Sequence, residues 1–316
     1  MRTSLPEDLL NPPENFADSP ETKFSDLPEN CISHILSLMG LPKEVCRMGL
    51  VSKVFLSASI ADTVWERLMP PDIIDGVLKR SVSEVVFDSK KELFLKLCFS
   101  PILIDGGRKC FSLDVSTGKK CYIISAREMT IIWGDDERYW HWNSLPESRF
   151  SEVATLSSVC WLEINAELNA SMLSPKTQYV AVFVMKYTEH PYGLGYPLAK
   201  LSLCMANQAS PSTKMASLLP LDRRVRRFWR SPLRAWNLGP VLPPEQLETI
   251  QLPRSQEPGV VPNPRPEGNG WMELEVGEFF VDEDSGNVQF SLLEIEGGHW
   301  KSGIIIEGLE IRPKGC

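Results

Sequence analysis

The sequence predicts an α+β protein, with a small N-terminal helical module followed by a larger antiparallel β-sandwich of jelly-roll type. Between residues 24 and 68 the apolar residues recur with the period of an α-helix. After Pro101 they alternate with polar residues, as in half-buried strands. Short strand-like runs are then separated by turns rich in glycine, aspartate and asparagine. We expect a helical module at 24–68, a connector with one helix at 69–100 and the β domain at 101–316.

Composition limits the class of function. The chain has 316 residues, 43% of them hydrophobic, and a net charge of −8, which is enough for a sizeable core and disfavours nucleic-acid binding. Its eight cysteines are scattered without a C-x-x-C pair, which predicts reduced thiols and no metal site. The acidic, proline-rich segment 1–23 predicts a disordered arm and not a secretory signal, and no apolar run is long enough to span a membrane. We therefore expect a cytoplasmic and nuclear protein without a cofactor.

The helical module begins with the clearest helix. Asp26 and Glu29 have the spacing of a capping box, and Gly40 is expected to end the helix because glycine easily adopts a left-handed conformation. One apolar stripe lies between them, formed by Ile32, Ile35, Leu36 and Met39. A unit of about 45 residues is near the lower limit for a self-sufficient core. Part of this apolar surface is thus covered either by the rest of the chain or by another protein.

The order of short motifs in the module favours the second alternative. It resembles the F-box family at Leu27-Pro28, Ile35-Leu36, Leu41-Pro42, Val51-Ser52-Lys53, Phe55 and Trp65. The resemblance implies docking on a Skp-type adaptor, and through it on a cullin, in a ubiquitin ligase whose substrate is selected by the rest of the chain. The implied adaptor-binding residues are Leu27, Pro28, Ile35, Leu36, Leu41 and Pro42.

The β domain is expected to begin with two hairpins. Residues 109–115 and 120–125 flank a turn that contains Gly118, and residues 130–133 pair with 139–142 across an acidic turn. Further strands are predicted at 158–166, 179–187, 199–206, 271–276, 288–295 and 303–311. The run 179–187 is apolar on both faces, which predicts a strand covered on both sides. At about 207–269 a proline-rich, arginine-rich excursion interrupts the strands; its arginines at 223–230 are typical of a phosphate-binding or nuclear-import patch or, more often, of a solvated loop.

An aromatic cluster around the acidic turn is the main candidate for a binding site. It consists of Trp133, Tyr139, Trp140 and Trp142, with Asp135, Asp136 and Glu137 between them. Aromatic faces stack on the C–H faces of sugars, and carboxylates accept hydrogen bonds from hydroxyl groups. The alternative is that the tryptophans belong to the core, because tryptophan is usually largely buried and Trp140 and Trp142 share one strand face.

A second resemblance favours the sugar site. The β domain is similar to the plant phloem lectin family, also called Nictaba-like, in blocks that include Lys119-Lys120-Cys121-Tyr122, Ile132-Trp133-Gly134, Ser148-Arg149-Phe150, Val159-Cys160-Trp161-Leu162-Glu163-Ile164 and Gly298-His299-Trp300-Lys301-Ser302-Gly303. It implies a β-sandwich lectin domain that binds N-acetylglucosamine oligomers or N-glycan cores. Two tryptophans seven residues apart bind sugar in lectin members, which here implies Trp133 and Trp140, with Asp135 and Asp136 as further hydrogen-bonding candidates.

Three functions follow from these observations. The leading hypothesis is a non-catalytic substrate receptor of a Skp–cullin–F-box ubiquitin ligase that recruits targets through its lectin-like domain. The second is a carbohydrate-binding protein that acts outside any ligase. The third is a glycoside hydrolase, which needs two carboxylates at a suitable separation; strand alternation instead places Glu273 and Glu275 on an outward face.

Overall fold

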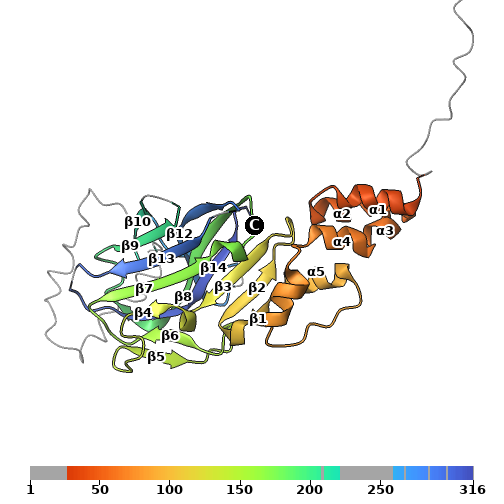
Figure 1. The fold of residues 1–316 in the computed structure, drawn as a ribbon. Helices are drawn as coiled ribbons and strands as arrows, with labels where there is room; N and C mark the ends of the chain where they lie inside the picture. Colours follow the sequence, from red (N-terminus) through yellow and green to blue (C-terminus); the bar gives the residue numbers. More distant parts are fainter. Residues whose placement is uncertain are drawn as a thin grey trace, which may run out of the picture.

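The computed structural model confirms the α+β fold, with N-terminal helices beside a mostly antiparallel β-sandwich (Figure 1). The structure describes residues 27–207, 210–220, 259–266, 268–283, 285–296 and 298–315. The predicted arm at 1–23, Asp26 of the capping box, the arginines at 223–230 and most of the proline-rich excursion lie outside the described residues. Both ends of that excursion nevertheless contain a short strand, β10 (Ser212–Ala216) and β11 (Asn263–Pro264).

The helical module consists of α1 (Glu29–Ser37), α2 (Pro42–Met48), α3 (Lys53–Ser59) and α4 (Asp62–Leu68). Gly40 is left-handed as predicted, with φ +71°, although α1 ends three residues earlier. Trp65 is fully buried, and its indole nitrogen Nε1 donates to the carbonyl oxygen of Ser59 at 2.8 Å. Glu29 is the first residue of α1, which has no side-chain cap, and its carboxylate accepts a hydrogen bond from Ser57 Oγ at 2.7 Å. Buried apolar residues of α1, α3 and α4 thus form a small core around Trp65.

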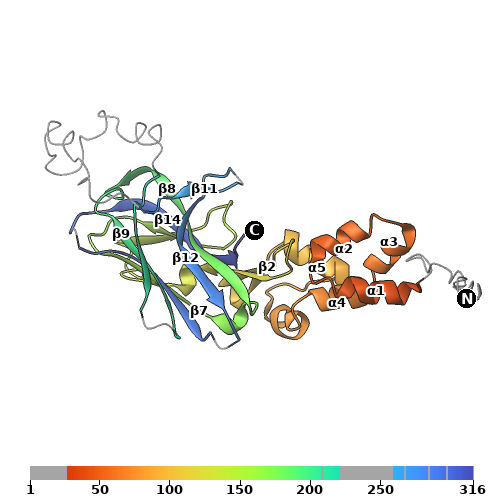
Figure 2. The ribbon, with the colours of Figure 1, turned by 90° about the horizontal axis from the view of Figure 1, so that it is seen from above.

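A connector joins this module to the sandwich. It contains a π-helical turn (Ile73–Val77), a 3₁₀ turn (Leu78–Arg80) and α5 (Lys90–Phe99), which packs Phe94 against Trp65 with ring centroids 5.0 Å apart. The hairpin turn between β2 (Lys109–Leu113) and β3 (Lys120–Ser125) also reaches the module. A Cβ atom on Gly118 would lie 3.0 Å from the carbonyl oxygen of Leu68, and Lys120 Nζ pairs with Asp72 Oδ2 at 2.6 Å. The module and the sandwich therefore share one continuous core, and the helices project from one end of the sandwich (Figure 2).

Within the described residues the sandwich has a nine-stranded sheet, which we name sheet A, and a five-stranded sheet, sheet B. The main path of sheet A has the strand order β1 (Ile102–Ile104), β2 (Lys109–Leu113), β3 (Lys120–Ser125), β14 (Ser302–Pro313), β8 (Thr177–Tyr192), β12 (Met272–Val281) and β11. Two further strands branch from β14: β6 (Val153–Leu156) pairs with β14, and β5 (Trp140–Asn143) pairs with β6. Sheet B runs β10, β9 (Ala199–Met205), β13 (Asn287–Glu294), β7 (Leu162–Asn169) and β4 (Thr130–Ile131).

One predicted hairpin is wrong. Residues 130–133 and 139–142 do not pair with each other, since β4 pairs with β7 in sheet B and β5 pairs with β6 in sheet A. β4 ends at Ile131, and two residues later Trp133 turns the chain, because its φ of +64° lies outside the β region. The segment 133–139 therefore bridges the two sheets instead of closing a hairpin.

The prediction of a strand covered on both faces is confirmed for β8. Phe183 faces the main core, whereas Val184 belongs to a second cluster with Val153, Trp271 and Ile305 on the outer face of sheet A. The segment between β5 and β6 covers this outer face. Leu145 packs on the second cluster, and Phe150 joins a third cluster with Cys110 and Ile123.

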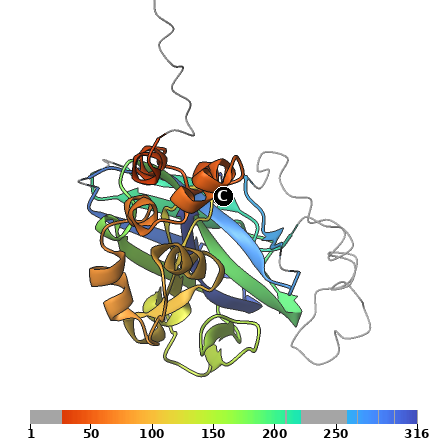
Figure 3. The ribbon, with the colours of Figure 1, turned by 90° about the vertical axis from the view of Figure 1, so that its right-hand side faces the viewer.

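The sandwich has two distinct ends. The turn between β2 and β3 faces the helices, whereas β13 ends at Glu294, on the side away from them (Figure 1). Seen from the helical side, the helices stand in front of the sheets (Figure 3). We refer to the end of the sandwich beyond Glu294, Trp133 and Leu162 as the distal end.

Candidate functional site

The helical module exposes an unusual number of apolar side chains. We name those from α1 to the first turn of α3 the apolar helix surface, formed by Ile35, Leu38, Met39, Leu41, Leu50, Val51 and Val54; Leu56 and Ile60 are exposed further along the module. Leu50 and Val51, in the turn between α2 and α3, are 86% and 64% exposed. Because exposed apolar residues in such numbers typically mark an interaction site, this surface is suited to bury itself against another protein.

The implied adaptor-binding residues divide between this surface and the interior. Ile35 and Leu41 belong to the apolar helix surface. Pro28, the residue before α1, is also exposed. Leu27 is half-buried and packs on the core. The structure does not place the other two on the surface: Leu36 is fully buried, and Pro42 is buried with its Cγ near the β2–β3 turn. Leu36 and Pro42 can support the docking surface only from within.

Sequence reasoning missed the most exposed residues of this surface. The implied adaptor-binding residues include neither Leu50 nor Val51. In the structure α2 ends at Met48 and α3 begins at Lys53, so both residues lie in the turn. Two adjacent apolar residues in a turn were the signal that could have identified them.

The aromatic cluster lies at the distal end, on the segment 133–142. Trp133 is 55% exposed, and its ring stacks at a tilt on Tyr139 with centroids 5.8 Å apart. Its left-handed backbone turns the chain, and Gly134 follows because a Cβ atom there would lie 2.9 Å from the carbonyl oxygen of Ile131. The exposed Trp133 face is thus presented by a tight, well-defined turn.

The other two tryptophans hold that turn. Trp140 is 1% exposed, and its Nε1 donates to the carbonyl oxygen of Ile132 at 3.2 Å. Trp142 Nε1 donates to the carbonyl oxygen of Gly134 at 2.8 Å, and the Arg127 guanidinium lies over the Trp142 ring at 3.7 Å from its centroid. The implied sugar-binding pair is therefore not a pair of surface rings. Trp133 is accessible, and Trp140 belongs to the core, as the alternative expectation had it.

The two aspartates differ in their surroundings. Asp136 accepts hydrogen bonds from the backbone N–H of Arg138 at 3.0 Å and from its Nη2 at 2.6 Å. The Arg138 side chain lowers the pKa of Asp136 to about 2. Asp135 is exposed at the tip of the turn. Asp136 therefore has a structural task in the turn, whereas Asp135 faces solvent next to Trp133.

Two further tryptophans are exposed at the distal end, and sequence reasoning did not single them out. Trp161 precedes β7 and is 45% exposed, and Trp300 precedes β14 and is 54% exposed. An antiparallel bridge between Val159 and Lys301 brings these two segments together. Lys301 is fully buried, forms an ion pair with Glu294 and donates to the carbonyl oxygen of Cys160 at 2.9 Å. A buried lysine thus fixes the backbone beside both tryptophans.

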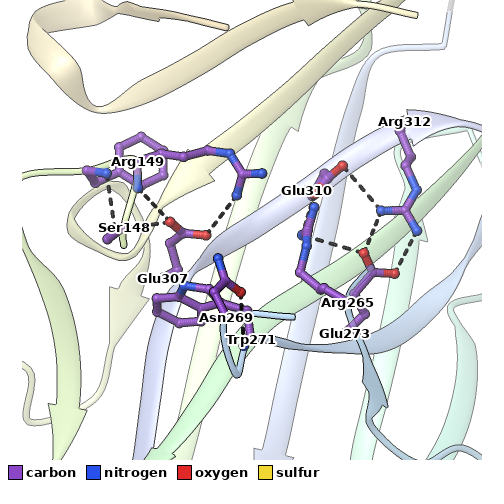
Figure 4. Close-up of polar contacts among 10 residues, drawn as sticks. Ser148, Arg149, Arg265, Asn269, Trp271, Glu273, Glu307, Glu310 and Arg312 are labelled. Carbon is purple, nitrogen blue, oxygen red and sulfur yellow. Dashed lines mark hydrogen bonds and ion pairs between the residues drawn. The ribbon is translucent and has the colours of Figure 1, made fainter. Parts of the chain in front are cut away.

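The outer face of sheet A carries a separate polar network (Figure 4). Arg312 makes a two-pronged pair with Glu273, 2.8 Å and 2.7 Å, and Arg265 Nη1 lies 2.6 Å from Glu310 Oε2. A shallow pocket of about 240 Å³ lies beside these residues, above Val180 and Val182. Both carboxylates named for the hydrolase hypothesis are paired here, since Glu273 contacts Arg312 and Glu275 contacts Lys214. The pairing makes these carboxylates poor candidates for general acids.

The described residues contain no group of three or more His, Cys, Asp or Glu side chains that could hold a metal ion. Nor does any described helix have the length and apolar character needed to span a membrane.

Comparisons with known proteins place these features in a family. Residues 119–313 match the family model of phloem protein 2. The chain is 40% identical to the F-box protein At2g02240 of Arabidopsis thaliana, over 93% of this chain and 82% of that protein. It is 33% identical to the F-box protein PP2-B1 and 36% identical to the F-box protein PP2-B10, both from Arabidopsis thaliana, over 93% of this chain and 90% and 96% of those proteins.

Proposed function

Because the chain belongs to the phloem protein 2 family, and its relatives are named F-box proteins, we propose that it is the substrate-recognition subunit of a Skp–cullin–F-box ubiquitin ligase. In this proposal the helical module docks on a Skp-type adaptor, and the sandwich recruits targets by binding glycans that contain N-acetylglucosamine. The chain itself carries out no covalent step.

The observation that carries the proposal is the separation of two exposed surfaces. The apolar helix surface belongs to the module at one end of the molecule, and the exposed Trp133 lies at the distal end of the sandwich. A receptor that holds an adaptor and a target together needs two surfaces that can be occupied at once. A shared core keeps the two surfaces at a fixed separation.

The helices also contact the sandwich, as they would in a stand-alone lectin whose helical module is only packed on the β domain. Pro42, Leu68 and Phe94 surround Gly118 of the β2–β3 turn. These contacts account for the buried residues of the module, but they leave Leu50 and Val51 exposed. A stand-alone lectin would have no use for this exposed surface, so the ligase subunit is the better proposal.

The proposed place of action is the cytoplasm and nucleus. Cys31, Cys46 and Cys160 are exposed free thiols. Exposed free thiols are compatible with a reducing compartment, where disulfides are rare.

Docking is tested by capture of a purified Skp-type adaptor. Replacing Leu41 or Leu50 by Asp places a charge on the apolar helix surface without disturbing a buried residue. Each change is expected to abolish capture, because truncation of a true anchor alone typically costs more than about 1 kcal/mol. Met215→Asp, at a 43% exposed residue of β10, is the matched control and should capture the adaptor like the wild type. Normal capture by both Leu variants would refute the docking assignment.

Glycan binding is tested separately, with N-acetylglucosamine oligomers and an N-glycan core. The wild type is expected to bind saturably, and Trp133→Ala is expected to lose binding while it keeps its circular dichroism spectrum. If folded wild-type protein binds none of these glycans, recruitment by sugar is excluded, and the docking test still stands by itself.

A further inference from the structure

We propose that Trp161 is a second sugar-stacking residue, and that the glycan site continues from Trp133 onto the outer face of sheet B. The inference rests on the proposed glycan binding and adds the extent of the site. Its ligand is a neutral oligosaccharide that is long enough to contact both tryptophans.

The position of Trp161 follows from the alternation of β7. Leu162 is fully buried, so its neighbours Trp161 and Glu163 face outward. A hydrogen bond of 2.8 Å from Trp161 Nε1 to Glu163 Oε2 shows that both side chains lie on that outer face. The indole ring is therefore held beside the sheet and does not swing freely in a loop.

The pairing of β4 with β7 brings Trp133 to the same place. Thr130 lies opposite Asn165, Ile131 lies opposite Ile164, and the backbone N–H of Ile132 donates to the carbonyl oxygen of Glu163 at 3.0 Å. Trp133 directly follows Ile132, beyond the end of β4, and Trp161 lies two residues before Glu163, just before β7. Because Ile132 is still hydrogen-bonded to Glu163, the backbone segments that carry the two exposed indoles are neighbours, within reach of one oligosaccharide.

The surrounding side chains match a neutral ligand with many hydroxyl groups. One row across sheet B consists of uncharged amide and hydroxyl side chains, namely Thr130, Asn165, Ser291, Ser202 and Thr213. Such groups both donate and accept hydrogen bonds, as sugar hydroxyls require. Glu163 adds a carboxylate, whose Oε1 accepts from Asn165 Nδ2 at 3.0 Å. The exposed Lys200 lies two strands away from Glu163 in the same row, whereas Glu163 accepts from the Trp161 indole itself, so a phosphorylated ligand at Trp161 fits less well than a neutral glycan.

A polar outer face is common for an antiparallel sheet. What distinguishes this face is a large exposed ring at its end, held in a fixed position. The backbone N–H of Val159 donates to the carbonyl oxygen of Lys301 at 2.9 Å, and Lys301 Nζ donates to that of Cys160, the residue before Trp161. A ring that is already in place loses little freedom on binding, which favours affinity.

The test is calorimetric titration of the full chain with chitobiose and chitohexaose. For the wild type we expect the longer ligand to bind more tightly. Trp161→Ala should bind chitobiose like the wild type and bind chitohexaose about tenfold more weakly than the wild type. Trp133→Ala should lose binding of both oligosaccharides. Phe280→Ala removes an aromatic ring that is 50% exposed on β12, in sheet A, and should change neither affinity.

The outcomes separate the inference from the function on which it rests. Chitohexaose binding by Trp161→Ala that equals the wild type overturns the inference and leaves glycan binding at Trp133 intact. Absence of binding by the wild type overturns both. If Trp161→Ala does not fold, hydroxyl-radical footprinting of the wild type decides, because chitohexaose should protect Trp161 from oxidation and chitobiose should not; equal labelling of Trp161 with and without chitohexaose overturns the inference.

Discussion

Trp140 donates its indole N–H to the carbonyl oxygen of Ile132, the residue that directly precedes Trp133. A buried ring thereby fixes the backbone that exposes another ring. The spacing of seven residues between the two tryptophans is thus explained by one closed turn, in which the second ring supports the first. This relationship assigns the two residues different tasks, which substitutions can separate.

Trp140→Ala is expected to destabilise the protein by about 3–5 kcal/mol, because it removes a fully buried large ring and leaves a cavity. Trp133→Ala removes a ring that is 55% exposed and is expected to change stability by less than about 1 kcal/mol. Urea unfolding of both variants measures the difference. Similar destabilisation by the two substitutions would show that Trp133 also supports the fold.

Sugar binding, in contrast to stability, should depend more on Trp133 than on Trp140. It is measured at low temperature, where the substituted proteins are still folded. Trp133→Ala is expected to lose binding, since the stacking ring is gone. Trp140→Phe keeps a large apolar side chain in the core but cannot donate to Ile132, so it should bind more weakly than the wild type without losing binding. Titration with chitobiose measures both. Wild-type affinity of Trp140→Phe would mean that the indole hydrogen bond does not position Trp133.

The turn is also expected to respond to acid. Arg138 lowers the pKa of Asp136 to about 2 from an ordinary value of 3.8, so the folded state favours the charged carboxylate. The stabilising effect is complete above about pH 4 and is lost as the pH falls toward 2. A carboxyl titration of Asp136 by NMR checks the pKa. In Arg138→Met it should return to near its ordinary value, and an unchanged pKa in that variant would exclude Arg138 as the cause.

The contact between the β2–β3 turn and the helices can be tested by adding one Cβ atom at Gly118. Gly118 has φ +70°, and a Cβ atom there would lie 3.0 Å from the carbonyl oxygen of Leu68. Gly118→Ala therefore combines backbone strain with a clash and should cost more than about 1 kcal/mol. Gly106→Ala is the matched control, because Gly106 has φ +66° but nothing within 4 Å of the added atom. Thermal unfolding should show a larger loss at Gly118, and equal losses would mean that the hairpin does not press on the module.

Local rules predicted much of this fold. Glycine at a turn, a stop signal and strict alternation act within a few residues, which is why the left-handed Gly40, the turn at Gly118 and the strand predicted at 158–166, observed as β7 at Leu162–Asn169, were foreseen. The mispaired β4 and β5 show where such rules fail. Which strand pairs with which depends on partners far away in sequence, such as β7 for β4.

The candidate sites show the same limit at the level of single residues. Ile35 and Leu36 are adjacent and apolar, yet Ile35 is 39% exposed and Leu36 is fully buried, because α3 and α4 cover only one side of α1. Periodicity shows that α1 has an apolar stripe but not where its covered part ends. Likewise the sequence contains Trp161, but its place beside Trp133 follows only from the pairing of β4 with β7.

A buried carboxylate holds the segment between β5 and β6 on sheet A, together with the packing of Leu145 and Phe150. Glu307 of β14 is fully buried and accepts hydrogen bonds from Ser148 Oγ at 3.0 Å, the backbone N–H of Arg149 at 2.8 Å and Arg149 Nη1 at 3.2 Å (Figure 4). Glu307→Ala removes the acceptor of all three bonds at once. Because loss of one partner of a buried ion pair typically costs about 3–5 kcal/mol, we expect a destabilisation of that order.

Glu307→Gln keeps the shape of the side chain and one acceptor oxygen, so its cost should be smaller, about 1.5–3 kcal/mol, as for a hydrogen bond to a charged group. Hydrogen exchange locates the effect. In Glu307→Gln the backbone amide of Arg149 should exchange faster, while the amides of β7 in sheet B keep their protection, because the segment covers only the outer face of sheet A. Uniformly faster exchange throughout the sandwich would contradict this local role and would make Glu307 a support of the whole fold.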